Sequence, residues 1–125
     1  MMIDNNLLFR NREASSVDHL SDGTIKFVYK NDEVEYIKNG KYHRIDGPAR
    51  KYVSGRLEWY YDGLLHNLGG PAVIAANGHQ RYFIAGQAAT IEMLDWINEN
   101  NMKYPFTNEQ QMLFKLCWSD YIFQE

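Results

Sequence analysis

Short runs of aromatic and branched residues alternate with turn residues through the middle of the chain, from about residue 34 to residue 86. Residues 57–61 and 80–84 are two such runs, each with Ser-Gly or Asn-Gly before it and Asp-Gly or Ala-Gly after it. Runs of this length between glycine turns are typical of strands joined in hairpins. Residues 49–53 and 72–76 supply the alternate strands. The pattern predicts an antiparallel β meander.

The hydrophobic pattern repeats at a step of 23 residues. The glycines that end three similar hexapeptides are Gly40, Gly63 and Gly86, and Gly55 and Gly78 form a second column with the same spacing. Glycine at these places indicates turns with positive φ, where a Cβ would clash. A fixed step of this size predicts stacked hairpins, each of which covers the apolar face of its neighbour.

A second sequence element shares the same step. Residues 43–49 read His-Arg-Ile-Asp-Gly-Pro-Ala, and residues 66–72 read His-Asn-Leu-Gly-Gly-Pro-Ala. Residues 19–23 resemble a degraded copy at a step of 24, so two good copies are flanked by two partial ones. Pro48 and Pro71 lack an amide hydrogen, which places them where the chain enters a strand or passes a turn.

Strand parity assigns side chains to two faces of the predicted sheet. One parity carries a column of aromatic residues that we expect to face the core: Tyr36, Trp59 and Tyr82. The other parity carries apolar residues beside charged ones: Ile37, Tyr60 and Phe83. This outer face is therefore predicted to be amphipathic and partly covered.

After Gly86 the hydrophobic spacing becomes helical. Thr90 is suited to be the N-cap of a first helix that ends near Asn100. Its apolar positions are Ile91, Met93, Leu94, Trp96 and Ile97. Residues 107–110 match a capping box for a second helix over about residues 108–121.

The second helix is predicted to pack on the open end of the sheet through an apolar stripe. The stripe consists of Met112, Leu113, Leu116, Cys117 and Tyr121. The first 20 residues predict no particular element. The whole chain, residues 1–125, is expected to be a single mainly β domain with C-terminal α structure, in which β-hairpin repeats span about 20–88 and a helical cap spans about 90–125.

The first copy resembles a repeat that is common in small proteins of tailed bacteriophages. Residues 39–49 and 54–60 follow the form Asn-Gly-Lys-x-His-Arg-x-Asp-Gly-Pro-Ala, then x-Gly-x-x-x-Trp-Tyr, which is distantly similar to MORN repeats. The resemblance covers about residues 20–100. The second copy departs from it, with Asn67 in place of arginine and Gly69 in place of aspartate. The resemblance to the phage repeat implies a repeat fold and a phage origin, and it implies no activity.

Composition and charge narrow the class of protein. A formal charge of -3 argues against non-specific binding of duplex nucleic acid, which needs a basic surface. The single cysteine, Cys117, allows no internal disulfide, and we expect it to be a core thiol. No export signal or membrane span is evident, so we expect a cytoplasmic protein, in the host cell if phage-encoded.

Catalytic and metal-binding motifs are not evident in the sequence, so we expect no catalytic residue, metal or cofactor. His43 and Asp46 are close enough in sequence to form an acid–base or metal pair. The same histidine recurs as His66 beside Gly69, where no carboxylate follows. The recurrence favours a turn-closing or stacking role. Three tryptophans, Trp59, Trp96 and Trp118, are expected in the core.

A basic segment interleaved with tyrosines is the candidate binding face. Residues 38–56 contain six basic residues and one acid, whereas the chain from residue 90 onward contains six acids and two bases. Such a face suits an acidic protein partner, or single-stranded nucleic acid or a nucleotide. In a third interpretation its bases pair with Glu33, Glu35 and Glu58 across strands. The candidate partner-binding residues are Lys41, Arg44, Arg50, Tyr52, Arg56 and Tyr60.

Together these features predict a non-enzymatic binding module. The most specific hypothesis, which rests on the phage resemblance, is an accessory protein that binds and inhibits a host protein such as a component of a defence system. The alternative is a protein that binds or sequesters a nucleotide or nucleic acid on the basic and aromatic face. The sequence leaves the oligomeric state open.

Overall fold

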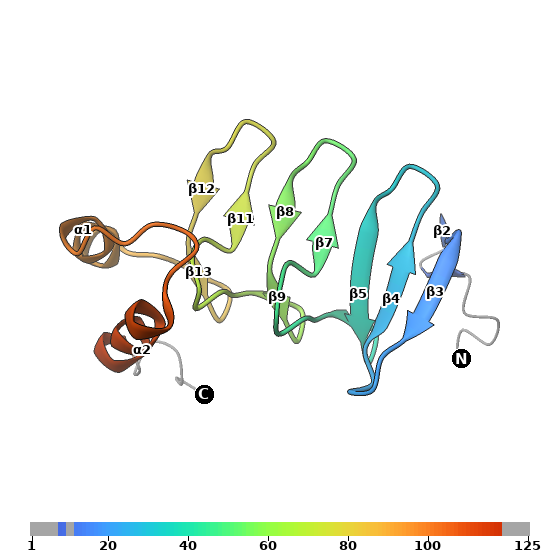
Figure 1. Cartoon of the computed structure of the whole chain (residues 1–125), viewed down its shortest axis with the longest axis horizontal. Helices are drawn as coiled ribbons and strands as arrows, with labels where there is room; N and C mark the ends of the chain where they lie inside the picture. The colour runs from blue at the N-terminus through green and yellow to red at the C-terminus, as the bar shows by residue number, and fades with distance from the viewer. Residues whose placement is uncertain (1–7, 10–11, 119–125) are drawn as a thin grey trace.

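A row of β-hairpins extends along one axis and is followed by two helices at its C-terminal end (Figure 1). The computed structural model describes residues 8–9 and 12–118. The predicted fold class, an antiparallel meander capped by two helices, is confirmed.

Within the described part of the chain the main sheet has eight strands, in the order β12-β11-β8-β7-β5-β4-β3 with β6 paired to β5. They are β3 (Ser16–His19), β4 (Ile25–Val28), β5 (Val34–Lys38), β6 (Lys41–Tyr42), β7 (Arg50–Lys51), β8 (Leu57–Glu58), β11 (Val73–Ile74) and β12 (Gln80–Arg81). Smaller antiparallel pairs are β1 (Leu8–Phe9) with β2 (Arg12–Glu13), β9 (Tyr60–Tyr61) with β10 (Leu64–Leu65), and β13 (Phe83–Ile84) with β14 (Gln87–Ala88).

Each predicted five-residue run is divided into two strands at its central aromatic residue. The N–H of Trp59 donates to the C=O of Ala72 on the next repeat (2.8 Å), whereas the C=O of Trp59 accepts from the N–H of His66 in its own hairpin (3.0 Å). The chain thus changes partner at this residue, because β8 pairs with β7 and β11 while β9 pairs with β10. Tyr82 divides β12 from β13 in the same way.

The glycine columns form the turns that the sequence predicts. Asn39 and Gly40 both have positive φ (52° and 77°), and Asp62 and Gly63 repeat this pattern (49° and 83°). Two consecutive residues with positive φ match the right-handed twist of a hairpin, and glycine adopts such a conformation without steric cost.

The recurring histidine closes the turn of the following hairpin, as its recurrence predicts. Nδ1 of buried His43 accepts from the N–H of Asp62 (3.1 Å), and Nδ1 of His66 accepts from the N–H of Ala85 (3.0 Å). The ring of Tyr61 lies between the two imidazoles, at 4.5 Å from His43 and 6.1 Å from His66. Burial lowers the pKa of His66, which favours the neutral ring that accepts this bond.

The residue after each recurring histidine shapes the loop before the proline. Nη1 of Arg44 donates to the C=O of Pro48 (3.1 Å), and Nδ2 of Asn67 donates to the C=O of Pro71 (2.8 Å). Asparagine therefore keeps the loop contact of arginine with a shorter side chain.

Within the described part of the chain the core includes two clusters of buried residues, and both sheet faces contribute to the core. The first cluster contains Ala14, Phe27, Tyr29 and Ile37, and the second contains Ile84, Met93, Ile97, Met102, Phe106 and Phe114. Tyr36 and Trp59 are buried and Tyr82 is half-buried, in agreement with the predicted inner face. Ile37, on the predicted outer face, is as deeply buried as they are. The expected division into inner and outer faces is therefore too simple.

Both helices begin as predicted. Helix α1 (Ile91–Glu99) starts at Thr90, whose side chain accepts from the N–H of Met93 (3.1 Å), and its C-cap is Asn100. Helix α2 (Asn108–Cys117) starts at Thr107 with the expected capping box. The predicted extension of α2 to Tyr121 lies outside the described residues.

The prediction of which side of α2 packs on the sheet is wrong. Met112, Leu113, Leu116 and Cys117 are exposed, so Cys117 is not a core thiol. The buried residue is Phe114, whose ring lies 5.9 Å from that of Phe106. The physical reason is tertiary: Phe106 donates its N–H to the C=O of Gly69 (2.8 Å), and this attachment orients α2 with Phe114 toward the core.

The tryptophans outside the repeats, and part of the α1 stripe, are less buried than predicted. Trp96 and Trp118 are half-buried and pack edge to face at 6.1 Å. In α1 only Met93 and Ile97 are buried, whereas Ile91 and Leu94 are exposed.

Tyr104 takes the place in the second repeat that the guanidinium of Arg44 has in the first. A Cβ built on Gly47 would lie 2.7 Å from Cζ of Arg44, and one built on Gly70, 23 residues later, would lie 2.5 Å from Cδ1 of Tyr104. Arg44 lies 4.1 Å from the ring centre of Tyr36. The equivalent ring in the second repeat, that of Trp59, contacts Tyr104 edge to face at 5.6 Å. The shorter side chain of Asn67 therefore leaves room for the segment that attaches the helices.

We expect Gly70→Ala to destabilise the protein by about 3 kcal/mol, because a Cβ there overlaps Tyr104. In the double variant with Tyr104→Ala the overlap with the ring disappears, while the positive φ of Gly70 (154°) and the Cβ of residue 104, 3.1 Å away, still oppose the substitution. The cost of the double variant should therefore be smaller than the sum of the two single costs by about 1 kcal/mol or more. Urea unfolding of the two single variants and the double variant measures this coupling. Strictly additive costs would contradict the assigned contact.

Candidate functional site

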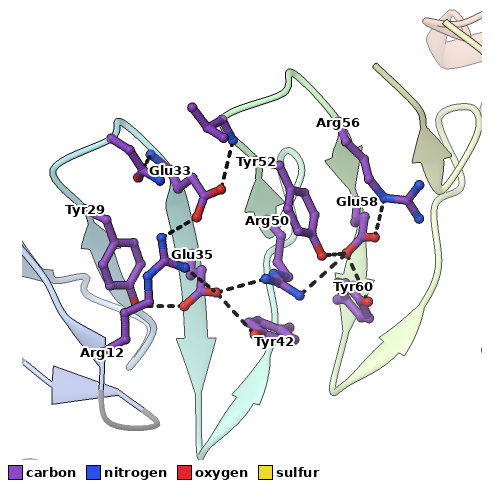
Figure 2. A network of polar contacts seen from close by, with 12 residues as sticks. Arg12, Tyr29, Glu33, Glu35, Tyr42, Arg50, Tyr52, Arg56, Glu58 and Tyr60 are labelled. Atoms are coloured by element: carbon purple, nitrogen blue, oxygen red, sulfur yellow. Dashed lines mark hydrogen bonds and ion pairs between the residues drawn. The ribbon is translucent and has the colours of Figure 1, made fainter. Parts of the chain in front are cut away.

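A network of polar side chains covers one face of the repeats and is organised by two buried glutamates (Figure 2). Side-chain exposure is 6% for Glu35 and 7% for Glu58, and the two residues are one repeat apart. Glu58 accepts from the hydroxyls of Tyr52 (3.0 Å) and Tyr60 (3.2 Å) and from Nε of Arg56 (2.8 Å). Buried carboxylates need such donors, because an unpaired buried charge is costly.

Glu35 gathers an equivalent set of donors one repeat earlier. It accepts from the hydroxyls of Tyr29 (2.8 Å) and Tyr42 (3.2 Å), and Nη2 of Arg50 lies 3.3 Å away. Arg50 also approaches Glu58 at 4.0 Å, so one guanidinium bridges the two carboxylates. The tyrosine–glutamate network, as we name it, comprises Arg12, Tyr29, Glu33, Glu35, Tyr42, Arg50, Tyr52, Arg56, Glu58 and Tyr60.

The N-terminal end of the network is closed by Arg12. Its guanidinium forms an ion pair with Glu33, approaches Glu35 at 3.9 Å and stacks on the ring of Tyr29 at 3.8 Å. The N–H of Val53 donates to Glu33, and this bond, with the help of Arg12, lowers the pKa of that carboxyl group.

Burial and the neighbouring carboxylates also shift the tyrosines. Burial raises the pKa of Tyr60 to about 12, with Glu58 as the second cause. The pKa values of Tyr29 and Tyr52 are raised for the same reasons, since a buried phenolate next to a carboxylate is unfavourable.

The six predicted binding residues do not form one surface. Arg50, Tyr52, Arg56 and Tyr60 come together in the network. The interpretation that bases pair with glutamates across strands is confirmed for Arg50, which pairs with Glu35, whereas Arg56 pairs with Glu58 two residues later in the same run of chain. Their charges are therefore already compensated.

The other two predicted residues lie elsewhere. Arg44 stacks on Tyr36, which follows Glu35 in β5, and successive residues of a strand point to opposite faces. Arg44 is therefore on the face opposite the network. Lys41 is exposed at a hairpin turn, and its stem lies against Gly63.

The face opposite the network contains a hollow of about 510 Å³ between two repeat loops and the part of the helical cap where α1 is linked to α2. Its lining comes from three stretches of chain and includes Arg44, Ile45, Tyr61, Asn67, Tyr104 and Gln111. Trp59 is among the other lining residues.

The polar side chains of Arg44, Asn67 and Gln111 in the hollow already form hydrogen bonds within the protein. Nε of Arg44 bonds to Asp46 (2.9 Å) and its Nη1 bonds to a backbone carbonyl. Asn67 donates to one backbone group and accepts from the N–H of Gly69 (2.8 Å). Nε2 of Gln111 donates to the C=O of Phe106 (3.2 Å).

Apolar surface remains uncovered around the hollow. Ile45 is 74% exposed, Tyr61 46% and Tyr104 40%. Large apolar side chains gathered around a concavity are the usual anchors of protein contacts. Sequence reasoning missed these residues, and the signal that pointed to the place was the pair of departures in the second copy, Asn67 and Gly69.

His43 and Asp46 do not form the pair that the enzyme hypothesis needs, since Asp46 bonds to Arg44 and His43 accepts a backbone N–H. Among residues 8–9 and 12–118, no group of three or more His, Cys, Asp or Glu side chains is placed to hold a metal ion. Neither of the helices in this part of the chain is long and apolar enough to span a bilayer.

Comparison of the chain with protein-family models, with curated proteins and with solved structures finds no match. A functional proposal must therefore rest on the geometry of the site and on the sequence itself.

We expect Glu58→Gln to destabilise the fold by about 2 kcal/mol, because the amide offers one acceptor oxygen and no charge to four donors. The matched control is Glu99→Gln, at an exposed position at the end of α1, which should cost less than about 0.5 kcal/mol. Urea unfolding at neutral pH compares the two. Equal effects would show that Glu58 does not organise the network.

The raised pKa of Tyr60 predicts alkaline destabilisation. The unfolded chain releases this proton near pH 10 and the folded protein near pH 12, so the stabilisation is complete below about pH 10 and is lost as the pH rises toward 12. Tyr60→Phe should be less stable at neutral pH, through the lost bond to Glu58, but should lose less stability between pH 9 and 11. Urea midpoints across this range are the measurement, and parallel profiles for the two proteins would refute the assignment.

Proposed function

We propose that this chain is a protein-binding module that acts by contact and not by catalysis. The hollow is its docking site, and the occupant is an apolar side chain of a partner protein. The observation that carries the proposal is the exposure of Ile45, Tyr61 and Tyr104 around a concavity whose polar groups are largely bonded already. An apolar anchor removes this surface from water without leaving a bonded polar group unpaired.

The charges of the molecule favour a protein over a nucleic acid or nucleotide. A phosphate needs cations that are free to pair with it, and binding of several phosphates is strongly salt-dependent. Arg44, the cation that lines the hollow, is bonded to Asp46, while Arg50 and Arg56 are paired with glutamates.

The resemblance to phage repeat proteins supports the identity of the partner class. It makes a host protein, such as a component of an antiviral defence system, the proposed target, and inhibition by occlusion the proposed action. Stacked hairpins suit this work, because each repeat is fixed by its neighbours and the surface loses little freedom on binding.

We expect Ile45→Asp to weaken binding of the partner at least tenfold, since it places a charge in the apolar contact. The matched control is Ile91→Asp, because Ile91 is as exposed as Ile45 (77% against 74%) but belongs to α1. The partner is first recovered from a bacterial lysate with the unchanged protein, and its affinity for each variant is then measured by calorimetry.

The salt dependence of the same titration tests the class of ligand. Affinity that changes little between 50 and 200 mM salt is expected for an apolar anchor, whereas a phosphate ligand would lose affinity by orders of magnitude over about this range. Equal binding by Ile45→Asp and Ile91→Asp would remove the hollow as the docking site.

A further inference from the structure

We infer a second binding surface, independent of the hollow: the outer edge of β12 accepts an extended acidic segment of a protein partner as an additional strand. Two separate observations point to it: a backbone donor without an acceptor and an arginine without a carboxylate, both judged among residues 8–9 and 12–118. Both occur where the repeat pattern stops.

The backbone observation concerns the three aromatic positions that are 23 residues apart. The N–H of Tyr36 donates to the C=O of Ala49, and the N–H of Trp59 donates to that of Ala72, both at 2.8 Å. For Tyr82, the third position, the described residues provide no acceptor. The reason is topological, since β12 is the last strand of the main sheet and no fourth repeat follows.

The helical cap contacts the ring of Tyr82, which stacks on that of Phe106 at 6.5 Å, but it leaves the edge of β12 itself uncovered. Helices α1 and α2 pack on a cluster that includes Ile84 of β13, while Gln80 and Arg81 of β12 remain exposed. In Figure 1 helix α2 lies beyond the lower part of the last hairpin and α1 is level with β11, while the turn between β11 and β12 stands above both helices. An uncovered edge strand presents backbone groups that can pair with another chain.

The charge observation concerns the position of the network glutamates. Glu35 and Glu58 are followed, 23 residues later, by Arg81. Among the described residues the one interaction of its side chain is a contact with the ring of Phe83, at 5.1 Å. Ala75 stands where Tyr52 provides a hydroxyl one repeat earlier. The third level of the network therefore presents a cation, and the part of the chain that the structure describes places no carboxylate beside it.

An acidic strand supplies both missing groups. Paired with β12, it would lie about 4.8 Å away and offer a carbonyl to the N–H of Tyr82. Every second side chain would point to the network face, and a glutamate or aspartate there would reach Arg81. Nucleic acid offers no ladder of carbonyl groups along its backbone, so a protein segment fits this edge better.

The test uses the full chain and synthetic peptides as probes. The acidic probe is acetyl-Thr-Val-Glu-Val-Glu-Val-Thr-amide, and the matched probe has lysine in place of both glutamates. Titrations followed by amide chemical shifts should show the acidic peptide perturbing Tyr82 and Arg81 and binding about fivefold or more tightly than the basic one. Arg81→Glu should reverse this preference.

Three controls separate the alternatives. Lys51→Glu changes an exposed charge next to Arg50 in β7, on the opposite face, and should leave the preference intact. Ile45→Asp should also bind the acidic peptide normally. This control distinguishes a wrong assignment of the hollow as docking site from a wrong assignment of the β12 edge as binding surface. The amide of Tyr82 should exchange with solvent faster than that of Trp59 in the free protein.

Equal affinity for the two peptides, or no shift at Tyr82, would overturn the inference. A second copy of the chain is the other possible occupant of this edge. If the protein self-associates as its concentration rises, and Asp18→Asn in edge strand β3 abolishes the association, a second copy occupies the edge in place of a partner.

Discussion

The structure depends on buried carboxylates that hold very short strands together. Most strands of the central repeats have two residues, and such strands form too few ladder bonds to be stable alone. Glu35 and Glu58 compensate by gathering hydroxyl and guanidinium donors from neighbouring hairpins, and Arg50 links one carboxylate to the next. The repeat step of 23 residues is the distance along the chain that returns a glutamate to this position.

The second repeat shows how such an array ends. A guanidinium and an aromatic ring are both flat and can occupy the same space above a glycine, and Arg44 and Tyr104 do so one repeat apart. Replacing arginine by Asn67 keeps the loop bond and frees this space for the incoming segment. The departure of the second copy at Asn67 therefore leaves room for the helical cap to dock, and Asn67 also lines one wall of the hollow.

Local features of the fold could be predicted from the sequence, and long-range ones could not. Glycine turns and the caps at Thr90 and Thr107 depend on residues within a few positions, and they were predicted correctly. The exposed side of α2 was predicted wrongly, because a helix with apolar residues on several sides is oriented by what it meets, here through Phe106 and Gly69. The hollow combines three distant stretches of chain, so the hydrophobic periodicity of the sequence does not predict it.

Ion pairing of the candidate binding residues is another long-range feature that the sequence does not predict. Six bases between residues 38 and 56 suggest a cationic face, but a count along the sequence does not show which of them meet a carboxylate. Arg50 and Arg56 do meet one, whereas Arg81, the one arginine among the described residues that pairs with no carboxylate, lies outside the basic segment.

The two proposed surfaces lie on different sides of the same sheet, and this constrains any single partner. The hollow is on the face of Arg44 and Tyr36, whereas Arg81 occupies the position of Glu58 on the network face. A flat partner surface could cover one of them only. A partner that uses both must add a strand at β12 and continue around the edge, so that its anchor reaches the hollow from the far side.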